Sequence, residues 1–195
     1  MVEHGNLSAG AMRALVLVVL GFAAGAIPFG VVIARRIAGV DIRTRGSGNI
    51  GATNVARVVG LVPGALVLVL DAAKGALPTG LALGWAGDPR VAIATGAAAI
   101  LGHCFSPWLG FRGGKGVATA LGVFVILTPE LAAVAVVVFA LVFVVTRVPA
   151  LGSIAGSASI AALLIAQRED LVAAFAVATT LLLLYTHRAN LAELR

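Results

Sequence analysis

The sequence has 195 residues, of which 61% are hydrophobic and only 11% charged, with a formal net charge of +6. Soluble domains carry about 25% charged residues, so this composition excludes an ordinary soluble globular protein. The single cysteine, Cys104, excludes an internal disulfide framework and a metal cluster held by cysteines alone.

Three long segments contain no charged residue. They are residues 14–34, 91–111 and 148–167, with lengths of 21, 21 and 20 residues. A membrane-spanning helix needs about 20 largely apolar residues. The sequence therefore predicts an all-α integral membrane protein, and residues 1–195 are expected to form a single polytopic domain.

The first apolar segment, residues 14–34, includes small residues at 24–26 that resemble a signal-peptide cleavage site. The apolar run continues past them, and Arg35 and Arg36 end it. We therefore interpret this segment as a retained first span, with the N-terminus outside.

A polar, basic stretch at residues 35–60 follows and contains Gly46-Ser47-Gly48-Asn49-Ile50-Gly51, a literal G-x-G-x-x-G. A dinucleotide site needs a strand before this motif and a βαβ unit around it, whereas here a membrane span precedes it. The remaining interpretations are an anion-binding loop or a solvated basic loop without a ligand. The candidate donors are Arg45, Ser47, Asn49, Thr53, Asn54 and Arg57.

The next span lies within residues 58–87 and is interrupted only by Asp71 and Lys74. Three residues apart on a helix, these two side chains share a face and can pair. Ionisable groups in the middle of a span are costly and usually face the protein interior. We favour an ion pair that links this helix to its neighbours over a direct chemical role.

Residues 102–119, GHCFSPWLGFRGGKGVAT, interrupt the apolar sequence with a glycine-dense turn. Glycines let a ligand approach backbone N–H groups closely, and a helix that begins after them would direct its positive dipole end to the same place. Arg112 and Lys115 add positive charge, so this turn predicts a phosphate site. It is not a P-loop, because Gly116 stands where Ser or Thr is required.

After residue 111 the chain contains four apolar segments, the already named 148–167 together with residues 116–129, 131–146 and 171–186, separated by proline and charged breaks. This gives seven predicted spans. With the N-terminus outside and the C-terminus cytoplasmic, ten cations lie on the inner side and three on the outer, as the positive-inside rule expects. The polar stretches at 46–57, 102–116 and 187–195 then share the cytoplasmic side.

Three stretches of the chain resemble the motifs of the bacterial acylphosphate-dependent glycerol-3-phosphate acyltransferases, the PlsY family. They are GSGNIGATNVAR at 46–57, GHCFSPWLGFRGGKGVAT at 102–119 and HRAN at 187–190, and the D-x-x-K-G-x-x-P pattern from Asp71 to Pro78 is also similar. The likeness runs from about residue 28 to residue 191. One departure is Ser106, which stands where the family pattern has proline.

The resemblance implies an enzyme of the bacterial inner membrane that transfers a fatty acyl group from acyl phosphate to the 1-hydroxyl of glycerol 3-phosphate. The product would be lysophosphatidic acid, made in the first step of phospholipid synthesis. The H-x4-D signature of other glycerolipid acyltransferases is absent, since Ala9, Trp108 and Ala192 follow the three histidines at that spacing. The expected partners are the two substrates, the lipid bilayer, the enzyme that makes acyl phosphate and the next acyltransferase. No nucleic acid, metal or cofactor is expected.

The resemblance also implies a set of site residues. Those at the reacting centre, which hold glycerol 3-phosphate, would be Ser47, Arg57, Lys115, His187 and Asn190. Asn49, Thr53, Gly113 and Gly114 would hold the acyl phosphate, and Arg45 and Ser153 would be further substrate-binding residues.

No nucleophile of the enzyme is expected, because acyl phosphate is already activated and positioning with charge neutralisation can lower the barrier. The hydroxyl proton would pass to His187 or to the substrate phosphate. His103 is interpreted as a residue that orients the turn, and Cys104 as a packing residue. The alternative function is a small transporter of anionic metabolites, but transporters commonly show paired halves and no repeat is visible here.

Overall fold

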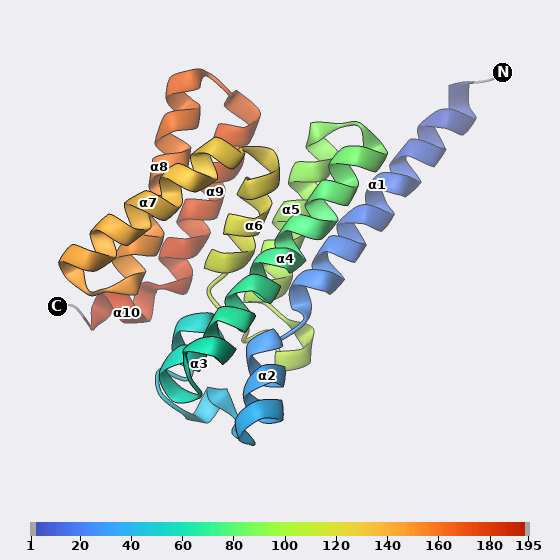
Figure 1. Ribbon diagram of the computed structural model, residues 1–195. Helices are drawn as coiled ribbons and strands as arrows, with labels where there is room; N and C mark the ends of the chain where they lie inside the picture. The colour runs from blue at the N-terminus through green and yellow to red at the C-terminus, as the bar shows by residue number, and fades with distance from the viewer. Residues whose placement is uncertain (1–2, 194–195) are drawn as a thin grey trace. The chain divides into compact units, whose positions relative to one another are not determined.

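The structure is a computed structural model that describes residues 3–193, with side chains from residue 9 onward. All regular elements in this part of the chain are helices. The chain divides into two compact units, with the boundary between Val123 and Phe124 inside one helix. Figure 1 labels the helices of both units.

The first unit contains α1 (Glu3–Ala26), α2 (Phe29–Ala38), the short helix η1 (Ile42–Thr44), α3 (Ala52–Val58), α4 (Leu61–Ala86), α5 (Pro89–Cys104), η2 (Pro107–Leu109) and most of α6 (Val117–Leu127). The second unit contains the end of α6, then α7 (Pro129–Thr146), α8 (Pro149–Gln167), α9 (Asp170–Thr186) and α10 (Arg188–Ala192). Three of the long helices begin with proline at the first helical position, where its missing N–H costs nothing.

In the first unit, α1 packs against both α5 and α4 (Figure 1). Gly21 and Gly25 on α1 face the backbone of α5, and a Cβ on Gly25 would lie on the carbonyl oxygen of Ala99. Small residues four apart let two membrane helices approach closely. This G-x-x-x-G pattern was present in the sequence, and its partner helix is a finding of the structure.

The predicted first span, residues 14–34, is divided in the structure. Helix α1 ends at Ala26, and α2 begins at Phe29 after Pro28. Proline lacks an N–H and breaks the hydrogen-bond ladder of a helix, and at this break the carbonyl groups of Ala26 and Ile27 accept hydrogen bonds from side chains elsewhere in the chain.

Within the described residues, five helical segments are long and apolar enough to cross a membrane: Ala9–Ala38, Leu61–Ala86, Pro89–Leu109, Pro129–Thr146 and Pro149–Gln167. The other two predicted spans are also helices, but α6 has 11 residues and α9 has 17. The helical structure is interrupted at Thr128, between α6 and α7, so these are separate helices, as expected. The count of seven spans remains a prediction.

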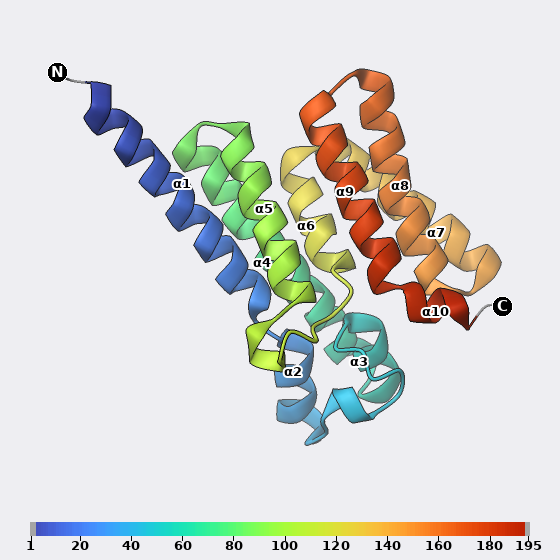
Figure 2. The same cartoon turned by 180° about the vertical axis from the view of Figure 1, so that it is seen from behind.

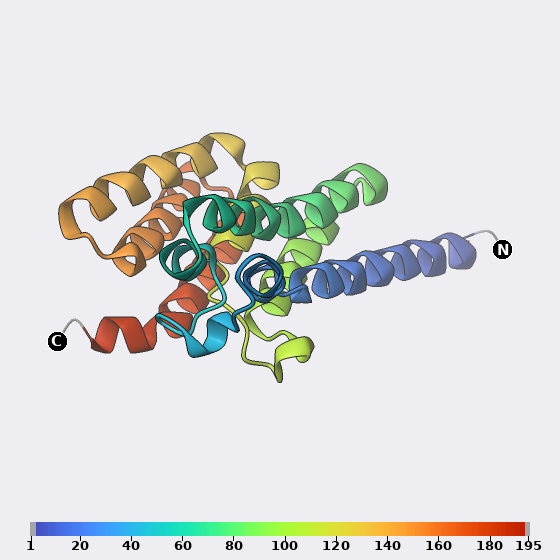
Figure 3. The same cartoon turned by 60° about the horizontal axis from the view of Figure 1, so that its bottom comes forward.

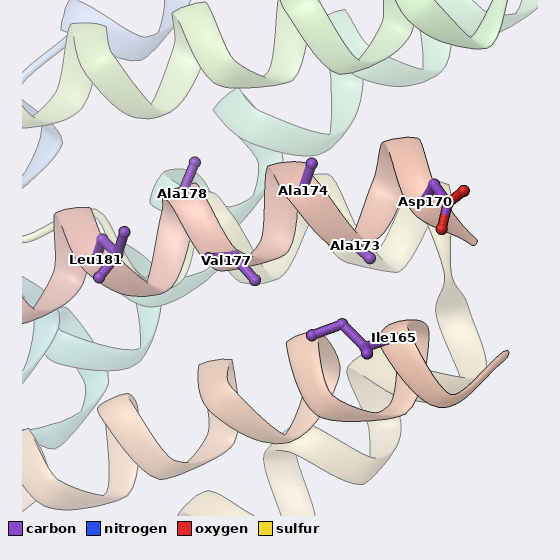
Figure 4. Close-up of a pocket in the computed structure, with 7 residues that line it drawn as sticks. All are labelled: Ile165, Asp170, Ala173, Ala174, Val177, Ala178 and Leu181. Atoms are coloured by element: carbon purple, nitrogen blue, oxygen red, sulfur yellow. The ribbon is translucent and has the colours of Figure 1, made fainter. Parts of the chain in front are cut away.

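In the second unit, α8 packs against α7 and α9, which Figure 2 shows from behind. The hydroxyl oxygens of Ser157 on α8 and Thr180 on α9 lie 2.7 Å apart and share a hydrogen bond. An open groove of about 420 Å³ runs along α9 (Figure 4). Its lining is apolar apart from Asp170 at one end, and it includes none of the predicted site residues.

Candidate active site

Both glycine-rich motifs of the first unit lie at one end of it, on a shared apolar cluster. Figure 3 shows α2 end-on, with α3 and the η2 turn beside it. The cluster consists of Val31, Ala34, Ile42, Ile50, Val55 and Val67, and Leu109 packs against it. Because Ile50 and Val55 belong to the first motif and Leu109 to the second, the fold brings these two predicted motifs together.

The first motif begins in a loop, residues 41–51, that we call the first loop, and continues into α3. The first loop is organised by the buried side chain of Asn54. The Asn54 amide donates to the carbonyls of Arg45 at 3.0 Å and Asn49 at 2.8 Å, and its oxygen accepts from the Ser47 N–H at 2.9 Å. The sequence marked Asn54 as one of several donors to a ligand, whereas the structure gives it to the backbone.

Two glycines of the first loop adopt the left-handed conformation, with φ of 57° at Gly46 and 70° at Gly48. L residues with a side chain rarely adopt this conformation, so glycine is required by the backbone itself. At Gly46 there is a second reason, because a Cβ would lie on the Asn54 side-chain oxygen.

The predicted ligand-binding side chains of this motif lie outside that buried frame. Arg45, Ser47, Thr53 and Arg57 are exposed, and Asn49 is half-buried with its side-chain oxygen accepting from the Gly51 N–H at 2.7 Å. A fixed backbone that presents hydroxyl and guanidinium groups to solvent can bind an anion.

Asp41 fixes the start of the first loop. Its carboxylate accepts from Arg43 Nε at 2.9 Å and from an Arg35 guanidinium nitrogen at 3.0 Å. The hydrogen bonds from Arg43 hold the pKa of Asp41 well below its ordinary value, and the same pairing raises the pKa of Arg43. These two arginines are therefore engaged in holding the loop.

The second motif forms a turn, residues 105–116, that we call the central turn. Its end folds back on α5: the N–H of Gly113 donates to the Cys104 carbonyl and that of Gly114 to the His103 carbonyl, each at 3.0 Å. Both N–H groups are therefore engaged within the chain, a different use from the phosphate contact that the sequence suggested. Gly116, with φ of 87°, then leads into α6.

Glycine is required in the central turn for space. A Cβ on Gly113 would lie on the carbonyl oxygen of His103, and a Cβ on Gly114 would lie on Nε2 of the His103 ring. Neither glycine has a positive φ. Lys115 follows directly and is half-buried.

Behind the central turn, three ionisable side chains are buried together. Asp71, Lys74 and His103 are 2%, 5% and 4% exposed. Lys74 Nζ lies 2.7 Å from Asp71 Oδ1, which confirms the predicted ion pair. His103 Nδ1 lies 3.7 Å from the same carboxylate oxygen, beyond hydrogen-bond length.

The same region satisfies the carbonyl groups freed by the break at Pro28. Lys74 Nζ donates to the Ile27 carbonyl at 2.8 Å, and the Ser106 hydroxyl donates to the Ala26 carbonyl at 2.6 Å. Inside a membrane, backbone polar groups must find partners within the protein. Ser106, a departure from the family pattern, thus has a defined structural role.

The remaining predicted residues belong to the second unit. His187 is buried directly after α9, and its Nδ1 lies 2.8 Å from the Leu183 carbonyl. A carbonyl only accepts, so Nδ1 is the donor in this hydrogen bond. Asn190 is half-buried in α10, and the buried Ser153 hydroxyl donates to the Pro149 carbonyl at 2.9 Å.

Cys104 is a free, buried cysteine at the end of α5, a setting that suits packing. Among the described residues, no group of three or more His, Cys, Asp or Glu side chains is arranged to hold a metal ion.

The helices and the two polar motifs packed at one end of the first unit define an integral membrane protein with a candidate anion-binding site. A sequence model of the glycerol-3-phosphate acyltransferase family matches residues 15–195. This chain belongs to that family.

Individual members of the family are similar to this chain over most of its length. A glycerol-3-phosphate acyltransferase of Myxococcus xanthus (strain DK1622) is 51% identical over 91% of this chain and 94% of its own length. One from Geobacter sulfurreducens is 42% identical over 94% of this chain and 95% of its own length.

Solved structures are similar as well. The crystal structure of PlsY (YgiH), an integral membrane glycerol 3-phosphate acyltransferase, in its glycerol 3-phosphate form has a TM-score of 0.88 and 40% identity, over 93% of this chain and 92% of that one. The lysophosphatidic acid form of the same protein has a TM-score of 0.87 and 40% identity, over 93% of this chain and 91% of that one.

Proposed function

We propose that this protein transfers a fatty acyl group from acyl phosphate to the 1-hydroxyl of glycerol 3-phosphate and releases lysophosphatidic acid and phosphate. The observation that carries the proposal is the similarity to a solved acyltransferase that is known in forms with glycerol 3-phosphate and with lysophosphatidic acid. The similarity covers both forms at 40% identity, and the first and second motifs share one apolar cluster here.

Within this proposal, the site residues keep the roles that the motifs imply. Those at the reacting centre are Ser47, Arg57, Lys115, His187 and Asn190, and they bind glycerol 3-phosphate. Asn49, Thr53, Gly113 and Gly114 hold the acyl phosphate, and the N–H groups of the two glycines are also engaged within the chain. Arg45 and Ser153 are further substrate-binding residues.

The chemistry needs no covalent intermediate on the enzyme. The substrate hydroxyl attacks the acyl carbon, phosphate leaves, and cationic donors neutralise the charge that grows during transfer. His187 or the substrate phosphate accepts the hydroxyl proton. The buried Cys104 takes no part. Acyl phosphate would be supplied by a separate enzyme and the product consumed by a second acyltransferase, so coupling to both belongs to the proposal.

The donor is tested with purified protein in lipid, glycerol 3-phosphate, and either palmitoyl phosphate or palmitoyl-CoA. Mass spectrometry should detect lysophosphatidic acid with palmitoyl phosphate and only background with the thioester. A Lys115→Ala protein serves as the control for contaminating activity. Product formation from palmitoyl-CoA alone would overturn the proposed donor.

We also propose seven spans in the bacterial inner membrane, with the N-terminus outside and the site on the cytoplasmic side. The support is the bias of ten cations to three across the predicted loops. In a Cys104→Ala background, single cysteines at positions 45 and 188 should be protected from an impermeant thiol reagent in intact cells, and one at 168 should react. Labelling at 188 from outside would reduce the span count.

A further inference from the structure

His103 stands between a buried ion pair and the central turn. One ring nitrogen, Nδ1, faces Asp71 Oδ1 at 3.7 Å, and the other, Nε2, occupies the place where a Cβ on Gly114 would lie. Asp71 is in turn held by Lys74 at 2.7 Å. Because all three side chains are at most 5% exposed, the ring has little room to move away from the turn.

The backbone of the same residue fixes the turn from a second direction. The His103 carbonyl accepts from the Gly114 N–H at 3.0 Å, while the ring covers the Cα of that glycine. Lys115 is the next residue. Any shift of the ring or of Gly114 therefore moves the backbone that carries the Lys115 side chain.

We infer that His103 is a positioning residue for Lys115: its ring, which faces Asp71, fixes the central turn, and Gly114 is glycine because that ring occupies the space of a side chain. The part of this inference that concerns catalysis rests on the proposed role of Lys115 in binding substrate phosphate. The part that concerns Gly114 rests on geometry alone.

A different explanation gives a different result. If Gly114 were glycine so that a phosphate could approach it, a Cβ there would harm activity whatever residue stood at 103. If the ring is the obstacle, a smaller residue at 103 should make the Cβ harmless. The test is therefore a double-mutant cycle with Gly114→Ala in the wild-type protein and in His103→Asn and His103→Ala proteins. Asn retains an N–H that can face Asp71 and lacks the ring edge over Gly114.

In the wild-type background, Gly114→Ala should lower kcat/KM about 100-fold, since a displacement of about 1 Å at a catalytic group can cost that much. In the His103→Asn background, the same substitution should change kcat/KM by less than about twofold, within the additivity error of such cycles. The melting temperatures of the wild-type protein, Gly114→Ala, His103→Asn and the double variant of these two should show the same pattern, and this measurement does not depend on activity.

Gly113→Ala is the matched control. Its Cβ would lie on the backbone carbonyl of His103, which every variant at 103 retains. Its cost should therefore be the same in the wild-type and His103→Asn backgrounds. Equal costs for Gly114→Ala in both backgrounds, or relief of Gly113→Ala by His103→Asn, would overturn the inference. So would failure of both His103 variants to fold, because such a residue would belong to the core and would not be a positioning residue.

A final arm separates the two parts of the inference. In a Lys115→Ala background, Gly114→Ala should cost little further activity, because the residue it displaces is already gone. If His103→Asn relieves Gly114→Ala but Lys115→Ala does not, the packing of the turn is as inferred and the proposed role of Lys115 is wrong.

Discussion

The first loop and the central turn are both glycine-rich, and the family resemblance assigns phosphate-bearing substrates to both, but the structure builds them in opposite ways. In the first loop, a buried side chain, Asn54, holds the backbone, and glycines are needed at 46 and 48 for a left-handed φ. In the central turn, the backbone is held by the last two carbonyls of α5, and Gly113 and Gly114 are needed because no space is left for a Cβ.

The comparison teaches that a glycine motif does not reveal by itself why glycine is there. A left-handed φ is a local property, and its cost falls on any L residue with a side chain. Whether there is space for a Cβ depends on the neighbouring residue, so a second substitution at that neighbour can create the space. The following predictions test this difference, beginning with the largest expected effect.

The central turn should lose function, and not stability, when its cation is removed. We expect Lys115→Ala to lower the rate of acyl transfer by about 10²–10³, the usual cost of a lost preorganised donor. The protein should still fold, because Lys115 is only half-buried. Steady-state kinetics and the melting temperature in detergent measure both effects.

Lys74 provides the contrast within the same protein, since it is the only other lysine. Lys74→Ala leaves Asp71 as an unpaired buried charge and removes one of the two donors to the Ile27 carbonyl, so stability should fall by about 3–5 kcal/mol. Adding Asp71→Asn should recover part of this loss. A stable, inactive Lys74→Ala protein beside an unstable Lys115→Ala protein would reverse the two roles.

The stability of the first loop should depend on both the donor and the acceptor of the Asn54 side-chain amide. Asn54→Asp retains an acceptor for the Ser47 N–H but loses the donor to the carbonyls of Arg45 and Asn49. We expect a loss of about 1–3 kcal/mol in stability for the unpaired buried groups, together with a higher KM for glycerol 3-phosphate. Asn54→Ala, which loses both ends, should be worse, and equal effects of the two variants would argue against the donor role.

Gly39 and Gly46 both have a left-handed φ. Comparing their substitutions separates the cost of the backbone conformation from the cost of a Cβ that has no space. Gly46→Ala should cost more than Gly39→Ala, because both positions have positive φ but only at 46 does a Cβ meet the Asn54 side chain. The conformational part should be about 1–2 kcal/mol at each position. Thermal unfolding of the two variants gives the difference, and equal melting temperatures would mean that Asn54 yields to the added Cβ.

The smallest effect should come from the ion pairs of Asp41 at the start of the first loop, and it should depend on pH. Because the pKa of Asp41 is lowered in the folded protein, its contribution to stability is fully present above the unfolded value of 3.8 and declines as the pH falls through the folded pKa. At pH 7, Asp41→Asn should lower the melting temperature by about 2 °C or less, as expected for a surface pair. The difference between the two proteins should shrink below pH 4, whereas a constant difference would show that ionisation plays no part.

Much of the fold could be read from local patterns. Apolar runs between proline and charged breaks predicted the helices, and the structure places helix starts at Pro129 and Pro149 and a separate helix for residues 117–127. The three-residue spacing of Asp71 and Lys74 predicted their ion pair, which is present. These features depend on residues a few positions apart, where the backbone fixes the geometry.

The sequence by itself thus determined the membrane class, the helical segments and the motifs that mark the family. It did not determine where the first span breaks, which helix the Gly21 and Gly25 pattern faces, or why Gly114 is glycine. Those features depend on contacts such as Lys74 with Ile27, 47 residues apart, and Ser106 with Ala26, 80 residues apart. The tertiary structure decided them, because hydrogen bonds and close packing between distant segments exist only after the helices have packed.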